Sequence, residues 1–142
     1  MTTRIDANLV EVLRGRFRLD WKGIHGASHW ERGRQNGLRL AEGIGPAVNL
    51  RVGELFAFLH DSCRRDDGYD PMHGPRAAAS IDELAEELPA LSHGERELLG
   101  YACTHHSDGL YDAEITVQVC WDADRLDLGR VGMIPDPARL CT

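Results

Sequence analysis

The segment VNLRVGELFAFLHDSC, residues 48–63, has a clear helical pattern and ends close to a histidine followed by an aspartate. Apolar residues recur in it at steps of three and four, which predicts a helix over about 48–63 whose buried face carries Val52, Leu55, Phe56 and Leu59. The pair His60-Asp61 follows this apolar run directly. Imidazole and carboxylate groups together are typical ligands of hydrolytic metal sites. The segment therefore predicts a core helix that delivers two candidate metal ligands.

Outward from this segment, most of the chain also has helical periodicity, and no alternating strand-like run occurs. We expect further helices over about 6–16, from residue 28 toward 43–46, and over 74–88, 92–105 and 112–128. Asp6 and Ser28 are candidate N-caps, and Ser92 with Glu95 forms a capping-box pattern. Residues 136–137, Asp-Pro, are expected to open a short terminal turn. The expected fold is all-α, a single-domain bundle of about six helices.

Composition limits the classes of protein to which the chain can belong. A length of 142 residues with 42% hydrophobic and 27% charged residues fits one ordinary globular domain, residues 1–142. The net charge of -7 disfavours a nucleic acid as partner, because its backbone is also anionic. No membrane-length apolar segment or signal-peptide core occurs, so a cytoplasmic protein without a membrane partner is expected. The four cysteines lack CxxC spacing, and the oligomeric state is left open.

Further candidate ligands lie on the helices expected before and after residues 48–63. His29 stands near the start of the second helix, with His25 as a rival upstream. Asp124 follows Val117 and Cys120 at helical steps, which directs its carboxylate inward, while the helical phase of Asp122 leaves that residue open. A buried carboxylate without a partner is costly, so a cation is expected beside it. The set His29, His60, Asp61 and Asp124 therefore predicts one metal site built from three helices.

The order of these residues resembles the HD superfamily of metal-dependent phosphohydrolases. The phrases that carry the resemblance are HWER (29–32), LHDS (59–62) and ADRLD (123–127), and the likeness covers about residues 24–132. It implies a helical HD-like domain with His29, His60, Asp61 and Asp124 as metal ligands. Gly33 departs from the usual aliphatic residue, which keeps His25 as an alternative to His29.

Some branches of this superfamily hold two metal ions, and the resemblance extends to the histidines that such a branch requires. His73 and the pair His105-His106 lie between the HD pair and the final aspartate. The resemblance implies that Asp61 bridges two ions, with His73 and either His105 or His106 on the second. His106 is favoured because it opens the turn that follows. One or two divalent ions per chain are expected, with Mn, Fe, Co, Ni, Zn or Mg as candidates.

The resemblance implies hydrolysis of a phosphoester by a metal-activated water, with a small phosphorylated metabolite or nucleotide as substrate. Asp61, Arg64 and Arg125 are the expected catalytic residues, and arginines beside the ligand phrases suit phosphate binding. Arg65 and Arg76 belong to the same group, although each arginine is equally suited to pair with a nearby aspartate. The loop 64–72 is expected to form a rim or lid. Two alternatives are a di-iron oxygenase and a non-catalytic module that binds a nucleotide or a metal ion.

Overall fold

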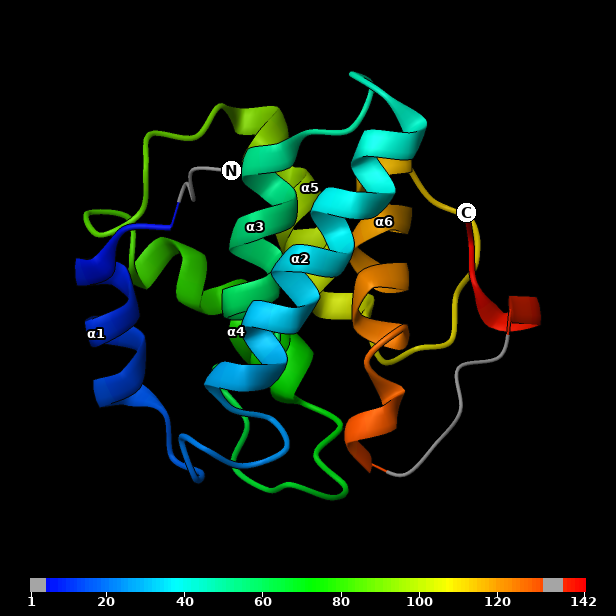
Figure 1. Cartoon of the computed structure of the whole chain (residues 1–142). Helices are drawn as coiled ribbons and strands as arrows, with labels where there is room; N and C mark the ends of the chain where they lie inside the picture. The colour runs from blue at the N-terminus through cyan, green and yellow to red at the C-terminus, as the bar shows by residue number, and fades with distance from the viewer. Residues whose placement is uncertain (1–4, 132–136) are drawn as a thin grey trace.

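The computed structural model describes residues 5–131 and 137–142. In this part of the chain all regular secondary structure is helical, which confirms the all-α prediction (Figure 1). The elements are α1 (Ala7–Arg16), α2 (Ala27–Ile44), α3 (Leu50–Leu59), α4 (His73–Glu83), α5 (His93–His105), α6 (Ile115–Arg125) and the short 3-10 helices η1 (Leu128–Val131) and η2 (Pro137–Arg139). The predicted terminal turn thus includes Pro137, while Asp136 lies outside the described residues.

Two of the three predicted helix starts are confirmed by their caps. The Asp6 carboxylate accepts a hydrogen bond from the Asn8 backbone at 2.6 Å and caps α1. Ser92 and Glu95 form the reciprocal capping box of α5. The prediction of Ser28 as N-cap is wrong, because the N-cap of α2 is Gly26. A Cβ atom at Gly26 would lie 2.2 Å from the carbonyl oxygen of Trp21, so the chain before α2 packs too closely for a side chain there.

Helices α3, α4 and α6 are shorter than the periodicity predicts. α3 ends at Leu59 instead of residue 63, α4 at Glu83 instead of 88, and α6 covers Ile115–Arg125 instead of 112–128. After α3 the chain turns, since both the backbone N–H and the hydroxyl of Ser62 donate to the carbonyl of Leu59, at 3.0 and 2.7 Å. His60 and Asp61 therefore lie at a turn, and both side chains reach one site.

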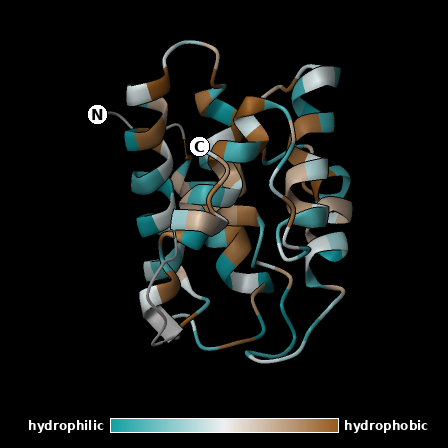
Figure 2. Ribbon diagram, turned by 90° about the vertical axis from the view of Figure 1, so that its right-hand side faces the viewer, coloured by the Kyte–Doolittle hydropathy of each residue, from teal (hydrophilic) through white to brown (hydrophobic). Residues whose placement is uncertain are grey.

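Helix α3 lies at the centre of the bundle and packs against α2, α5 and α6. Seven of its ten residues are buried. The largest fully buried side chains around it include Trp30 on α2 and Trp121 on α6. In Figure 1, α1 lies at the edge of the bundle, and Figure 2 shows hydrophobic and hydrophilic residues on different sides of the same helices. The described part of the chain contains no helix whose length and hydropathy would let it cross a bilayer.

Candidate metal centre

The first group of candidate ligands joins three helices around His29 and His60. Their Nε2 atoms lie 3.1 Å apart. The Nε2 atom of His29 lies 3.1 Å from Oδ2 of Asp61 and 3.1 Å from Oδ1 of Asp124. His60 Nε2 lies 3.4 and 3.2 Å from the same two oxygens. All four residues are buried except Asp124, whose side chain is 14% exposed. The four predicted ligands thus present one atom each to a common point.

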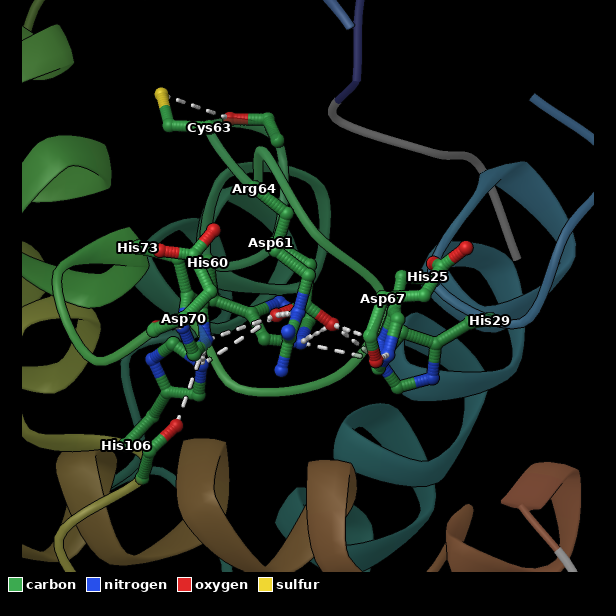
Figure 3. A network of polar contacts seen from close by, with 12 residues as sticks. His25, His29, His60, Asp61, Cys63, Arg64, Asp67, Asp70, His73 and His106 are labelled. Atoms are coloured by element: carbon green, nitrogen blue, oxygen red, sulfur yellow. Dashed lines mark hydrogen bonds and ion pairs between the residues drawn. The ribbon is translucent and has the colours of Figure 1, made fainter. Parts of the chain in front are cut away.

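A second group adjoins the first through the other oxygen of Asp61. Oδ1 of Asp61 lies 3.3 Å from His73 Nε2 and 3.4 Å from His106 Nε2, and these two nitrogens are 2.8 Å apart. His73 begins α4 and His106 follows α5. The side chains in Figure 3 reach Asp61 from both sides. One carboxylate therefore faces two sets of ligand atoms, one on each oxygen.

Hydrogen bonds to the outer ring nitrogens set the orientation of the imidazole rings. The Nδ1 atoms of His60, His73 and His106 lie 2.5–3.1 Å from main-chain carbonyl oxygens. A carbonyl only accepts, so each of these Nδ1 atoms carries the hydrogen, and Nε2 of the neutral ring holds a lone pair. His29 Nδ1 lies 2.7 Å from Oδ2 of Asp127, which selects the same tautomer. In each of the pairs His29–His60 and His73–His106, two Nε2 lone pairs thus face each other. This arrangement requires a cation or a proton between the two nitrogens.

The pKa values of the histidines and aspartates in the first group are shifted because the opposite charges lie close together. Burial lowers the pKa of His60, but the negative charges of Asp61 and Asp124 outweigh burial and raise it to about 10. Burial also opposes charge on His29, yet hydrogen bonds to Asp124, Asp127 and Asp61 raise its pKa to about 9. The pKa values of Asp61 and Asp124 lie well below their usual range, because nearby histidines outweigh the opposing effect of burial. The carboxylates therefore attract positive charge to this site.

Within the second group, His106 differs electrostatically from His29 and His60. Burial lowers its pKa, and the charge of His60 acts in the same direction, while its hydrogen bond with Asp61 opposes them. A lowered pKa keeps the imidazole neutral, which is the form that binds a metal ion. The residues of both groups therefore fit one or more divalent cations with mixed nitrogen and oxygen ligands.

Two further residues contact Asp61 without belonging to either group. Arg64 donates from Nε to Oδ1 of Asp61 at 3.2 Å, and from Nη1 to the carbonyls of Asp66 and Gly68. His25 Nδ1 lies 3.3 Å from Oδ2 of Asp61, and its Nε2 lies 2.9 Å from the carbonyl oxygen of Asp67. Both side chains connect Asp61 to the loop after α3 (Figure 3). His25 thus lies beside the two groups, whereas His29 is a member of the first group.

Three candidates from the sequence point elsewhere. Asp122 is buried, but it accepts hydrogen bonds from the backbone N–H groups of residues 141 and 142, both at 2.7 Å. His105 pairs with Asp108 at 2.7 Å on the surface. Arg125 donates to the carbonyl of Leu110 at 2.6 Å, and its guanidinium lies over the ring of Trp121. The expectation of metal ligation by Asp122 or His105, and of a catalytic Arg125, has no support from this geometry.

Asp127 is the residue near the site whose role sequence reasoning missed. Its carboxylate bonds His29 Nδ1 through Oδ2 and Arg32 Nε through Oδ1, both at 2.7 Å. Burial raises its pKa, but the hydrogen bonds with His29 and Arg32 outweigh this and lower it. The sequence feature that could have indicated this role is its spacing: Asp127 follows Asp124 by three residues, which places both on the same side of the chain where α6 ends.

Comparison of the chain with models of protein families, with curated proteins and with solved structures finds no match.

Proposed function

We propose that this chain is a metal-dependent phosphohydrolase that acts on a small phosphorylated metabolite or nucleotide. The observation that carries the proposal is the pair of Nε2–Nε2 contacts, 3.1 Å between His29 and His60 and 2.8 Å between His73 and His106. Each contact lies against an oxygen of Asp61. Two Nε2 atoms at such distances repel each other when both rings are neutral and also when both are protonated, and a metal ion bound between two neutral rings removes that repulsion.

His29, His60, Asp61 and Asp124 would hold one ion, and Asp61, His73 and His106 a second. Such ions supply an activated water at neutral pH and stabilise charge on phosphoryl oxygens. Asp61 keeps both groups together because each of its oxygens faces one of them. Arg64 holds that carboxylate in place through its Nε hydrogen bond. Its Nη1 contacts with two loop carbonyls fix the loop beside the site.

The phosphoester substrate class is supported by the order of the ligand phrases along the sequence and by the metal chemistry that mixed histidine and aspartate ligands allow. A di-iron oxygenase is the second candidate, since the second group takes two histidine nitrogens and one carboxylate oxygen. Iron content together with oxygen consumption separates the two reactions. Retained nucleotide binding without turnover would instead favour a binding module.

The variant Asp61→Ala tests the proposal. We expect it to lose bound metal and the hydrolysis of p-nitrophenyl phosphate and bis(p-nitrophenyl) phosphate, because both ligand groups need this carboxylate. Asp82→Ala is the matched control, since the Asp82 side chain is 86% exposed on α4. Metal analysis, initial rates and far-ultraviolet circular dichroism provide the readouts. Full hydrolysis by Asp61→Ala, with the helical content of wild type, would refute the proposal.

A further inference from the structure

A cavity of about 590 Å³ lies on the other side of the turn that carries Asp61. Its walls come from the end of α1 and the loop behind it, from residues 62–65, and from α4 with residue 84. None of the ligands in the two metal groups lines it. Figure 3 shows Cys63, which does line it, pointing away from the histidines. The volume falls within the range of small-molecule sites and is separate from the metal centre.

Positive charge is concentrated in this cavity although the whole chain has a net charge of -7. Five arginines line it together with one acid, Glu83; they are Arg16, Arg18, Arg64, Arg65 and Arg76. Three of the five are already paired: Arg16 with Glu83 at 3.3 Å, Arg64 with Asp61 at 3.2 Å, and Arg76 with Asp70 at 2.5 Å.

The side chains of Arg18 and Arg65 make no ion pair or hydrogen bond with any residue in the described part of the chain. The cavity therefore has an excess of two positive charges over its acidic partners. A phosphomonoester or phosphonate group carries up to two negative charges, and guanidinium groups bind its oxygens in bidentate geometry. The excess positive charge of the cavity matches such a group.

The rest of the wall is apolar. Leu13 and Leu84 are 1% and 2% exposed and contribute to it, as do the half-buried ring of Phe17 and the methyl group of Ala79. Inorganic phosphate would leave this surface without a partner, whereas an organic phosphate places its carbon skeleton against it. We infer that this cavity is a binding site for a small organic phosphate, held by Arg18 and Arg65 and separate from the metal centre. The inference does not depend on catalysis by that centre.

Isothermal titration calorimetry with benzylphosphonate, a phosphonate with an apolar body that the protein cannot hydrolyse, tests the inference on the full chain. We expect saturable binding in wild type that the metal-site variant Asp124→Asn leaves unchanged. The double variant Arg18→Gln/Arg65→Gln should weaken binding by about tenfold or more, because each loses a charge-assisted hydrogen bond. The control Arg39→Gln/Arg96→Gln removes the same charge from exposed positions outside the cavity and should bind like wild type.

A second variant tests the shape of the cavity without a change in charge. Ala79 lies exposed on α4, and Ala79→Trp places a large ring in the cavity at little cost to folding. It should also weaken binding by about tenfold or more, since the ring occupies the volume of the ligand.

Three results would overturn the inference: no saturable binding by wild type, binding that Asp124→Asn abolishes while the arginine double variant retains it, or inorganic phosphate bound as tightly as benzylphosphonate. The first excludes a site, the second moves it to the metal centre, and the third removes the organic ligand. None of these three results bears on the hydrolysis assay with Asp61→Ala, so this inference and the proposed function can fail separately.

Discussion

Each candidate histidine ligand has its outer nitrogen fixed before any metal ion binds. His60, His73 and His106 use backbone carbonyls, and His29 uses the carboxylate of Asp127. Such hydrogen bonds select the tautomer and direct Nε2 to the site, so a ring does not have to reorient when an ion arrives. We therefore expect the metal affinity of the proposed site to depend also on residues that do not touch the ion.

Asp127 provides a test at this scale. Asp127→Asn removes the negative charge behind His29 while it preserves the shape of the side chain. We expect metal affinity to fall by about 10- to 100-fold, measured by competition with a chromogenic chelator, with unchanged helical content. Asp108→Asn is the matched control, because Asp108 pairs with His105 at the same 2.7 Å but outside the metal groups. Equal affinities of Asp127→Asn and wild type would contradict this role of Asp127.

Residue by residue, helical phase explains which candidate residues face the two ligand groups. Asp124 and His106 face the site, whereas their sequence neighbours Arg125 and His105 point away from it. Consecutive residues on a helix leave about 100° apart, so a neighbour in sequence is seldom a neighbour in the site. Sequence proximity suggested a catalytic Arg125, while the structure places its guanidinium against Leu110 and Trp121.

Among the elements, the contact between α4 and α5 positions the second ligand group. Gly74, directly after His73, lies so close to the end of α5 that a Cβ atom would be 2.6 Å from the carbonyl oxygen of Cys103. The same Cβ atom would lie 2.8 Å from the carbonyl oxygen of Thr104. A glycine at this position therefore allows the close approach of His73 and His106.

Gly74→Ala should lower the free energy of unfolding by about 1–3 kcal/mol, because a methyl group cannot fit without a backbone shift. Gly53→Ala is the matched control, since a Cβ atom at Gly53 on α3 meets nothing within 4 Å. The control should leave stability unchanged or raise it by about 0.5–1 kcal/mol through lower chain entropy. Urea denaturation of the two variants measures the difference, and equal stabilities would argue against the close contact.

The capping box of α5 connects two helix starts. Glu95 accepts from the Ser92 backbone at 3.0 Å and from the Asn49 side chain at 3.0 Å, and Asn49 itself caps α3. These hydrogen bonds, the one from Ser92 above all, hold the pKa of Glu95 below its ordinary value of 4.5. The carboxylate thus stabilises the fold in its ionised form.

Glu95→Ala should lower the free energy of unfolding by about 1 kcal/mol at pH 7. Because the pKa of Glu95 is lower in the folded protein than in the unfolded chain, its contribution is present above the ordinary value of 4.5 and disappears as the pH falls through the lowered pKa. Denaturation of wild type and variant at pH 7 and pH 3 measures this convergence. A difference in stability that stays constant between the two pH values would contradict it.

Helix identity and most helix ends could be predicted from sequence, but the C-terminal ends of α3 and α4 and both ends of α6 could not. The capping box at Ser92 depends on residues three apart, which is why a local pattern found it. The end of α3 at Leu59 depends on a turn that brings His60 and Asp61 to ligands from distant helices. Apolar periodicity continues through such a turn, so the prediction extended the helix to residue 63.

For the whole molecule, the candidate metal centre joins segments that are far apart in the sequence, from residue 29 to residue 124. An unfolded chain does not bring these ligands together, so a bound ion stabilises the folded state alone. Without an ion, the negative charges of Asp61 and Asp124 face the surrounding histidines, and Asp61 also accepts a hydrogen bond from Arg64. The proposed metal site therefore predicts that folding and metal binding are linked.

Removal of metal by a chelator should lower the melting temperature, and addition of the ion should restore it. At an ion concentration 100 times the dissociation constant, the linkage is worth about 2.7 kcal/mol, or a shift of roughly 5–11 °C for a domain of this size. Differential scanning fluorimetry measures the shift. Asp61→Ala should melt at the same temperature with and without metal. A shift in this variant equal to that of wild type would mean that the ion binds elsewhere.

The number of metal ions bound per chain tests the central claim most directly. After saturation with Mn²⁺ and gel filtration, elemental analysis of wild type should give about two ions, one for each ligand group. The same measurement on Asp61→Ala should give close to none. A wild-type count no higher than that of Asp61→Ala would contradict the account.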